Sequence, residues 1–287
     1  MYKSSGELST TVPGLTLRST QLPADTRHMK IAANGIRINV RDRGRGEPSL
    51  VFLHYWGGSS RTWDEVIDQL ADQHRSIALD HRGWGESDAP AQGYGISDLA
   101  NDAQSVITAL ELQRYVIVGH SMGGKTAQLL ASRRPVGLAG LVLVAPAPPG
   151  PTVLPNERRE ALLHIYDSRE SIAYVRDNVL TALPLSESQK ERVIEDSLRG
   201  AAAAKLAWPT LAMLEDIRAD VRRINVPTLV LSGEKDPVDP PAKLRDEVLP
   251  RIPGAQLQVL PRAGHLPMLE VPEAVAGAIR QFSGAVA

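Results

Sequence analysis

Short runs of consecutive apolar residues recur along this chain, and longer stretches with a different apolar spacing lie between them. Runs of this kind, apolar at every position, are typical of strands that are covered on both faces of a sheet. They occur at residues 50–53 and 115–118, and similar runs with one polar residue or glycine lie at 76–79, 138–144, 228–231 and 257–260. The intervening stretches carry apolar residues at helical spacing, which predicts helices at about 62–72, 96–110, 126–133, 241–248 and 274–282. This alternation predicts an α/β fold with a parallel sheet and crossover helices.

The start of the chain predicts a β-hairpin after a loose arm. Residues 31–33 and 36–40 are strand-like and flank Asn34-Gly35, a pair that tolerates the positive φ angles of a tight turn. The preceding residues, 1–28, are polar and rich in Ser, Thr and Pro, and they lack the apolar centre of a signal peptide. We therefore expect this stretch to be an N-terminal arm that precedes the folded core.

The alternation of strands and helices breaks after the apolar run at 138–144. A Pro-rich stretch at 145–151 opens this region, and no strand pattern follows it. We interpret residues 151–220 as a helical insertion that caps the sheet, and we assign residues 29–150 and 221–287 to a single core domain. The helical patterns inside the insertion lie at about 158–165, 171–180, 187–198 and 208–217.

Composition narrows the classes of function. The chain has 287 residues, of which 43% are apolar and 23% are charged, as in an ordinary globular protein. Its formal net charge is -1 and no Lys/Arg block stands out, so we expect neither a nucleic acid nor a membrane as a partner. The absence of cysteine excludes thiol catalysis, disulfide bonds and thiolate metal sites. Because no apolar run approaches transmembrane length, we expect a cytoplasmic protein.

A serine in a glycine-rich turn organises the candidate chemistry. The stretch G-H-S-M-G at 119–123 follows a predicted strand and precedes a predicted helix, with Ser121 at its centre. Strand, sharp turn and helix, with a serine at the turn, form the setting of a nucleophile elbow. Glycine is expected on both sides because a side chain there would collide with the neighbouring strand or helix. The pentapeptide alone is also compatible with a tight turn whose serine merely caps the helix.

A serine hydroxyl needs an adjacent base, and the base must itself be oriented by an acid. The predicted base is His265, because it follows a glycine just after the last predicted strand and therefore lies at the edge of the sheet. The predicted acid is Asp236, which follows the strand at 228–231, with Asp239 as a second choice and Glu234 as a third.

Five sequence blocks together resemble the α/β-hydrolase superfamily from about residue 30 to the end of the chain. The order Ser121, Asp236, His265 is also the one expected of that superfamily. The resemblance, which points to its serine-esterase and cofactor-free perhydrolase branches, implies a mostly parallel eight-stranded sheet flanked by helices. The first hairpin adds an antiparallel strand, and a helical cap is inserted. The blocks are H-Y-W-G-G at 54–58, D-H-R-G-W-G-E-S at 80–87, G-H-S-M-G-G at 119–124, G-E-K-D at 233–236 and G-H at 264–265.

The resemblance also implies where the oxyanion of an attacked carbonyl would be bound. One donor is the backbone N–H of Met122, directly after the nucleophile. The second comes from the loop at 54–58, which in related enzymes usually reads His-Gly-x, with x as the donor. This chain has Tyr55 in place of that glycine, so Trp56 takes the donor position. How closely the Tyr55 backbone approaches a substrate is left open.

The block at 80–87 clusters charged residues but is predicted to be structural. Its glycines would shape a turn, and Arg82 would pair with local carboxylates or carbonyls. His54, Asp80 and His81 do not have the spacing of a metal-ligand set. We therefore expect no metal and no cofactor.

The predicted cap should set specificity. Its apolar and aromatic residues could line an acyl or alcohol pocket, although a stripe at helical spacing is usually a packing face. The candidates for a substrate pocket are Tyr55, His120, Tyr166 and Trp208.

Taken together, these features predict a carboxylesterase-like serine hydrolase that cleaves a small to medium, partly apolar ester through an acyl-enzyme. Lactone hydrolysis, C–C bond hydrolysis and peracid formation of the cofactor-free haloperoxidase type use the same apparatus and stay open. A ligand-binding protein with negligible turnover is the alternative from another class. The sequence leaves the substrate undetermined, and it does not separate a monomer from a homo-oligomer.

Overall fold

The strands of this chain form one eight-stranded sheet with the spatial order β1-β2-β4-β3-β5-β6-β7-β8. They are β1 (Arg27–Ala33), β2 (Ile36–Arg43), β3 (Ser49–Leu53), β4 (Ser76–Leu79), β5 (Tyr115–His120), β6 (Leu138–Val144), β7 (Thr228–Gly233) and β8 (Gln256–Leu260). The computed structural model describes residues 26–287. β2 pairs antiparallel with β1 and β4, and the neighbouring pairs from β4 to β8 are parallel. The predicted α/β fold with a mostly parallel eight-stranded sheet is confirmed.

The predicted hairpin opens the sheet. Asn34 and Gly35 have φ angles of 49° and 81°, the left-handed values that a two-residue hairpin turn requires. β1 takes in Arg27 and His28, which the sequence pattern assigns to the N-terminal arm. Pairing with β2 extends the strand because an edge strand needs no apolar residue on its exposed face. Residues 1–25 of the predicted arm lie outside the described part of the chain.

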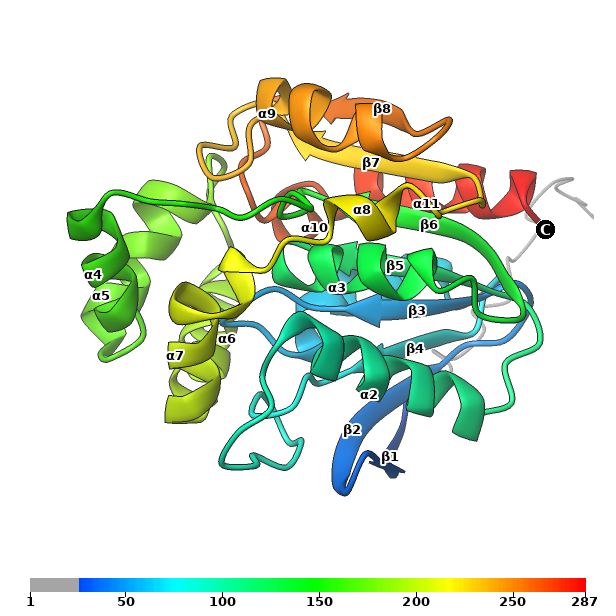
Figure 1. Ribbon diagram of the computed structural model, residues 1–287, viewed down its shortest axis with the longest axis horizontal. Helices are drawn as coiled ribbons and strands as arrows, with labels where there is room; N and C mark the ends of the chain where they lie inside the picture. Colours follow the sequence, from blue (N-terminus) through cyan, green and yellow to red (C-terminus); the bar gives the residue numbers. More distant parts are fainter. Residues whose placement is uncertain (1–25) are drawn as a thin grey trace, which may run out of the picture.

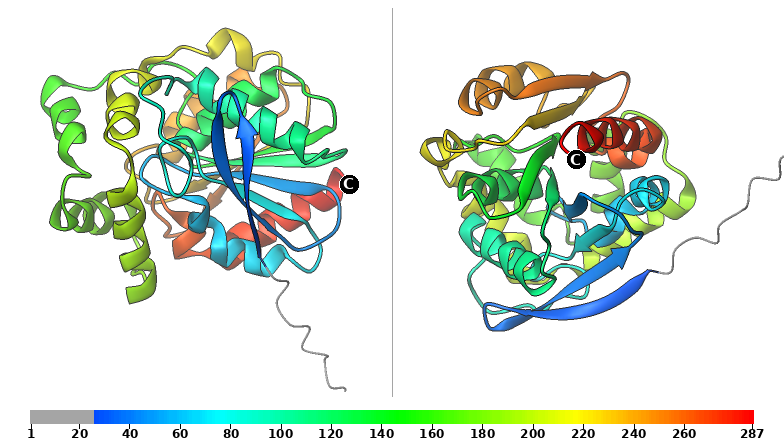
Figure 2. Two further views of the ribbon diagram at one scale, coloured as in Figure 1. Left: turned by 90° about the horizontal axis from the view of Figure 1, so that it is seen from below. Right: turned by 90° about the vertical axis from the view of Figure 1, so that its right-hand side faces the viewer.

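Helices cover both faces of the sheet. They are α1 (Asp64–Leu70), α2 (Ile96–Ala109), α3 (Met122–Ser132), α8 (Arg218–Val221), α9 (Pro241–Glu247), α10 (Pro267–Glu270) and α11 (Pro272–Ala285). α2, α3 and α8 lie on one face, and α1, α10 and α11 lie on the other (Figure 1). Figure 2 shows these two layers on opposite sides of the twisted sheet. Among residues 26–287 no helix combines the length and apolar character needed to cross a bilayer.

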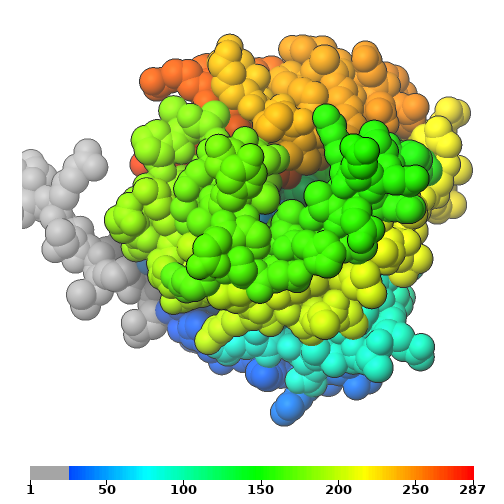
Figure 3. Space-filling model, turned by 90° about the vertical axis from the view of Figure 1, so that its left-hand side faces the viewer, coloured from blue at the N-terminus to red at the C-terminus, as the bar shows by residue number. Residues whose placement is uncertain are grey.

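The chain forms further helices beyond the carboxyl ends of the parallel strands (Figure 1). They are α4 (Asn156–His164), α5 (Arg169–Val175), α6 (Glu187–Arg199) and α7 (Ala202–Thr210). Residues 145–227, all of them described, contain no strand. We call residues 151–220 the helical segment, and Figure 3 shows it in green to yellow-green over the middle of this end of the molecule. The boundary expected at residue 220 falls inside α8, which packs against α3.

Shorter turns complete the described chain. They are the 3₁₀ helices η1 (Ser60–Trp63), η3 (Ala212–Leu214) and η4 (Leu249–Arg251), and the π-helical turn η2 (Arg176–Leu180).

The helix predicted at 208–217 is wrong. α7 ends at Thr210, because Leu211, with φ −135° and ψ −70°, turns the chain out of helical conformation. α7 instead begins at Ala202, in an alanine-rich stretch that apolar periodicity does not detect. Alanine has the highest helix propensity, but a run of alanines carries no amphipathic stripe.

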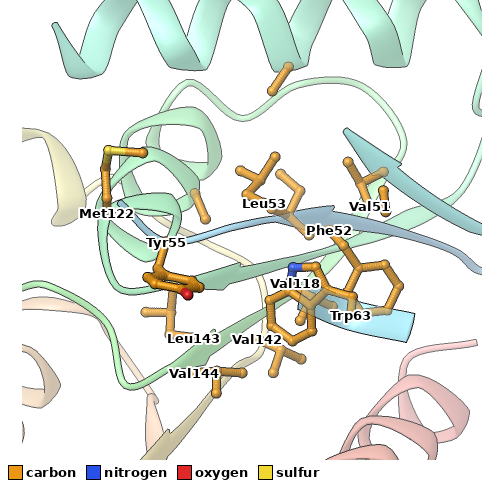
Figure 4. Close-up of a cluster of buried hydrophobic side chains, with 14 of the residues drawn as sticks. Val51, Phe52, Leu53, Tyr55, Trp63, Val118, Met122, Val142, Leu143 and Val144 are labelled. Carbon is orange, nitrogen blue, oxygen red and sulfur yellow. The ribbon is translucent and has the colours of Figure 1, made fainter. Parts of the chain in front are cut away.

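The centre of the sheet is closed to solvent. β3, β4 and β5 are buried at every position, which explains why their sequences are apolar at consecutive positions instead of alternate ones. Figure 4 shows part of this core, including Val51, Phe52 and Val118. Trp63 of η1 packs against Phe52 with ring centroids 5.1 Å apart. The loops at the carboxyl ends of these strands are therefore anchored in a close-packed interior.

Candidate active site

Ser121 occupies a strained turn between β5 and α3. Its φ of 51° and ψ of −114° lie outside the regions that a non-glycine residue normally adopts. The Ser121 N–H donates to the carbonyl of Val144 on β6 at 3.2 Å, and the Ser121 carbonyl accepts from the Lys125 N–H at 3.0 Å. A Cβ on Gly119 would overlap the backbone of Gly123, and a Cβ on Gly123 would overlap the carbonyls at the end of β3. Close approach of the backbone therefore requires both glycines.

Three predicted residues form one chain of hydrogen bonds. Ser121 Oγ lies 3.0 Å from His265 Nε2, and His265 Nδ1 lies 2.8 Å from Asp236 Oδ2. Ser121 follows β5, Asp236 follows β7, and His265 lies between β8 and α10. The site is almost enclosed, because Ser121 is 9% exposed and His265 2%. This is the arrangement that a serine nucleophile with a base and an orienting acid requires.

Asp236 is the carboxylate that contacts His265. Its other oxygen accepts hydrogen bonds from two backbone N–H groups of the turn that follows. Asp239 is also buried, but its carboxylate pairs with Lys243 at 2.9 Å. Glu234 is exposed and accepts from a backbone N–H of the loop after β8. The three acidic residues therefore have different partners in the structure, a distinction that their spacing in the sequence does not make.

The pKa values of the two partners move in opposite directions. Burial favours a neutral His265, but the charge of Asp236 and the hydrogen bond to it outweigh burial, so the pKa of His265 lies above its ordinary value. Burial likewise favours a neutral Asp236, yet His265 and the two backbone N–H groups hold the pKa of Asp236 below its ordinary value. Asp236 is therefore ionised at neutral pH and favours the imidazolium that forms when His265 accepts a proton.

The backbone N–H groups of Trp56 and Met122 donate to no acceptor within residues 26–287. Met122 is the first residue of α3, so its N–H is one of the unpaired donors at a helix N-terminus. Trp56 lies in the loop after β3, and the start of that loop packs on Gly123, just behind Ser121. Both groups are free to donate to an oxyanion; their role in binding one stays a prediction.

The residues predicted for a substrate pocket have different surroundings. Tyr55 and His120 are buried, with ring centroids 5.2 Å apart, and Figure 4 shows Tyr55 among apolar core side chains. His120 Nε2 lies 2.7 Å from the carbonyl of His265, so this ring holds the backbone of the base. Tyr166 is buried against the loop after β3, and Trp208 is half-buried. The contacts of Tyr55 and His120 favour a packing role over an open pocket wall.

Sequence reasoning missed the group that holds the loop of His265. The carboxylate of Glu270 on α10 accepts from the N–H of Gly264 at 2.9 Å and from two N–H groups of the helical segment. The His265 N–H donates to the carbonyl of Leu180 at 2.9 Å. The helical segment therefore shapes the backbone around the base. A lone glutamate gives no sequence signal for this, because its partners in the segment are 87 and 88 residues away.

The charged block at 80–87 makes the contacts expected of a structural turn. Asp80 accepts hydrogen bonds from two backbone N–H groups and from the side chain of Asn39. Arg82 forms a buried ion pair with Asp102 of α2, with Nε and Oδ2 2.6 Å apart. In the part of the chain that the structure describes, no three His, Cys, Asp or Glu side chains are grouped so that they could hold a metal ion.

Residues 50–278 match the family model described as the alpha/beta hydrolase family. The chain belongs to this family. A solved esterase from Exiguobacterium antarcticum aligns with a TM-score of 0.82 and 25% identity, covering 90% of this chain and 100% of that one. The 2-succinyl-6-hydroxy-2,4-cyclohexadiene-1-carboxylate synthase of Enterobacter sp. (strain 638) is 31% identical over 252 residues, 83% of this chain and 92% of its own length. The non-heme haloperoxidase of Rhodococcus erythropolis is 28% identical over 250 residues, 82% of this chain and 91% of its own.

These relatives carry the names of different activities. The α/β-hydrolase family and its esterase members support a hydrolase-type enzyme, but membership alone does not select the reaction or the substrate.

Proposed function

We propose that this α/β-hydrolase is a serine hydrolase that cleaves a carboxylic ester of a small to medium, partly apolar substrate. The observation that carries the proposal is the unbroken chain of hydrogen bonds from Ser121 through His265 to Asp236. A serine activated in this way attacks a carbonyl carbon, and esters are more reactive toward such attack than amides. The similarity to a solved esterase supports the same reaction.

In the proposed reaction, Ser121 Oγ attacks the ester carbonyl while His265 Nε2 takes the hydroxyl proton. The carbonyl oxygen becomes an oxyanion, to which the N–H groups of Trp56 and Met122 donate. His265 then returns the proton to the departing alcohol, which leaves an acyl group on Ser121. Water attacks this acyl-enzyme, again with His265 as base, and releases the carboxylic acid. Asp236 orients His265 and stabilises the imidazolium in both halves of the reaction.

The helical segment, in this proposal, acts as a cap over the site. It lies beyond the end of the sheet at which the parallel strands terminate (Figure 1), and Ser121 is only 9% exposed. A substrate would therefore reach the serine through space that the segment restricts. Trp208 belongs to the segment, is half-buried and supplies aromatic surface, which favours an acyl or alcohol group of limited size with apolar character.

Peracid formation is the second candidate, and the similarity to the haloperoxidase of R. erythropolis favours it. The same serine could take an acyl group from a carboxylic acid, with loss of water, and pass it to hydrogen peroxide to give a peracid. Lactone hydrolysis and C–C bond hydrolysis would use the same groups, but no feature of the described site favours either of them.

Stopped-flow hydrolysis of p-nitrophenyl acetate, butyrate and octanoate tests the proposal. We expect a burst followed by turnover in the wild type, and a loss of about 10⁴-fold or more in kcat in Ser121→Ala. Ser132→Ala is the matched control, because Ser132 is a buried serine on α3 whose hydroxyl donates only to a helix carbonyl, that of Leu129, at 2.7 Å. It should keep wild-type rates. The dependence of the hydrolysis rate on the length of the acyl chain would indicate the size of the pocket.

Ester hydrolysis that persists in Ser121→Ala would contradict the mechanism. If the wild type shows no serine-dependent turnover on any of the three esters, the ester proposal is wrong. Peracid formation from acetate and hydrogen peroxide, detected by bromide oxidation, would then identify the second candidate. No turnover in either assay would favour a ligand-binding protein.

A further inference from the structure

We propose that Tyr166 positions the Trp56 N–H for oxyanion binding, so that the helical segment completes the site by holding the loop after β3. This inference rests on the proposed function. Tyr166 is then a positioning residue and not part of the pocket wall, because its hydroxyl donates a hydrogen bond to the protein backbone.

A closed ring of three hydrogen bonds joins Tyr166, Trp56 and Lys205. The Tyr166 hydroxyl donates to the Trp56 carbonyl at 2.6 Å. The Trp56 indole N–H donates to the carbonyl of Lys205 on α7 at 3.1 Å, and the Lys205 ammonium donates to the Tyr166 carbonyl at 3.0 Å. The two aromatic rings also pack together, with centroids 4.5 Å apart. Trp56 is therefore fixed to the helical segment by its backbone and by its side chain.

The residue after Trp56 is shaped for the same contact. Gly57 has a φ of 100°, and a Cβ on it would overlap the Tyr166 hydroxyl, so both its conformation and its surroundings require glycine. The Gly57 carbonyl accepts a hydrogen bond from Ser197 Oγ of α6 at 2.9 Å. Side chains of the helical segment therefore bind two consecutive carbonyls of the loop, those of Trp56 and Gly57.

The core holds the peptide plane on the other side of Trp56. This plane carries the Trp56 N–H, and its carbonyl, that of Tyr55, accepts from the Gly58 N–H at 3.1 Å and contacts His54 Nδ1 at 2.7 Å. His54 Nε2 accepts from the His81 N–H at 2.9 Å, so Nδ1 carries the proton and donates. Trp56 thus lies between one plane held by the core and one held by the helical segment, and the direction of its N–H depends on both.

An oxyanion donor accelerates the reaction only if it is already aimed at the position where charge develops. Without the Tyr166 hydroxyl, the Trp56 carbonyl would lose its donor in a buried setting, and the loop would relax to regain one. Burial holds the pKa of Tyr166 well above its ordinary value, so the hydroxyl stays a donor at any pH at which the reaction would be measured.

Tyr166→Phe, which removes only the hydroxyl, tests the inference. With p-nitrophenyl butyrate we expect kcat to fall about 10-fold, below the ~10²–10³-fold loss that follows deletion of a whole oxyanion donor. KM should change less than about two-fold, because ground-state binding is not involved. Tyr94→Phe is the matched control: Tyr94 is 6% exposed against 4% for Tyr166, and its hydroxyl also donates to a carbonyl, that of Pro90, at 2.7 Å. It should keep the wild-type kcat.

Hydrogen exchange, followed by mass spectrometry, gives a readout that does not depend on turnover. Peptides covering the loop after β3 should exchange faster in Tyr166→Phe than in the wild type, and at the wild-type rate in Tyr94→Phe. A general loss of stability would instead raise exchange throughout the protein, or would affect both variants.

Unchanged exchange in the loop of Tyr166→Phe overturns the inference, whatever the rates. So does an unchanged kcat in an enzyme that turns over, or a raised KM with normal kcat, which would assign Tyr166 to substrate binding. If the wild type hydrolyses no ester, the proposed function fails, and the exchange of the loop alone decides whether Tyr166 holds it.

Discussion

At the scale of single residues, Ser121 keeps a backbone conformation that costs about 1–3 kcal/mol for a residue other than glycine. The surroundings maintain it, since the Ser121 carbonyl accepts from the N–H groups of both Lys125 and Ala147, at 3.0 and 3.1 Å. The turn also gives Ser121 Oγ its 3.0 Å contact with His265. The strain therefore serves the proposed chemistry, because a relaxed turn would move the hydroxyl away from the base.

The choice of acid leads to a prediction at this scale. Asp236→Asn should lower kcat by about 10⁴-fold, because the amide no longer holds His265 in the reactive tautomer or stabilises its cation. His265 must be neutral to accept a proton, and its pKa lies above the ordinary value mainly because Asp236 outweighs burial. The acid limb of kcat/KM in the wild type should therefore lie above about pH 6.5 and shift to lower pH in Asp236→Asn.

Asp239→Asn is the control for this experiment, because Asp239 is a buried carboxylate of the same loop that pairs with Lys243. Asp239 and Glu270 also raise the pKa of His265, but they contribute less than Asp236. A pH–rate profile of both variants separates the roles. If Asp239→Asn shows the larger loss in kcat, the assignment of Asp236 as the acid is wrong.

At the scale of elements, Asp102 joins three parts of the fold. It lies on α2, is 0% exposed, and pairs with Arg82 from the loop after β4. It also accepts a hydrogen bond from Asn34 in the turn between β1 and β2, at 2.8 Å. The edge of the sheet, the charged loop and α2 are therefore connected through one buried carboxylate.

Arg82→Met should destabilise the protein by about 3–5 kcal/mol, because it leaves the Asp102 charge buried without its cation. Urea denaturation followed by circular dichroism measures the change in the free energy of unfolding. Arg223→Met is the control, since the Arg223 side chain is 58% exposed in its pair with Asp220 and such pairs contribute about 1 kcal/mol or less. Equal losses in the two variants would show that burial of the Arg82 pair is not what matters.

At the scale of the whole molecule, Lys125 fixes both ends of the helical segment to α3. Its buried ammonium donates to the carbonyls of Gly150, Met213 and Glu215, at 3.2, 3.3 and 2.6 Å. The first of these carbonyls lies directly before the segment, and the other two lie close to its end. The helix that starts behind Ser121 is therefore also the helix to which the proposed cap is tied.

Lys125→Met keeps the length of the side chain but removes three donors. We expect a loss of about 1–3 kcal/mol, because the three carbonyls lose their partner, and faster cleavage within the helical segment in limited proteolysis. Lys235→Met, at an exposed position, should leave the cleavage rate unchanged. An unchanged rate in Lys125→Met would show that other contacts hold the segment.

The wild type should also show a pH dependence that Lys125→Met lacks. Burial lowers the pKa of Lys125 from 10.5 to about 8. When the segment is open, this amine is solvated and keeps its proton up to a higher pH. Between about pH 8 and pH 10.5 the protein with an open segment therefore binds more protons than the protein with a closed segment. Raising the pH through that window therefore favours the closed segment, and cleavage in the wild type should slow.

The sequence by itself determined the parts of this protein whose signals are local. The strands at 76–79 and 138–144 have the predicted bounds, because a strand that is largely buried on both faces is apolar at most consecutive positions. The turn around Ser121 was predictable for a similar reason, since its glycines are required by backbone contacts within the turn and the adjacent strand. The start of α7 was not, because a run of alanines forms a helix without an apolar stripe.

Only the tertiary structure decided which distant groups meet. Sequence spacing ranked Asp236 first among three acids, but the structure is what places its carboxylate, and not that of Asp239 or Glu234, against His265. Tyr166 and the Trp56 carbonyl are 110 residues apart in the chain, and no periodicity relates them. Such contacts form where loops from separate strands and the helical segment come together at one edge of the sheet. These contacts depend on how the elements pack in three dimensions, so they cannot be predicted from a local pattern of apolar and polar residues.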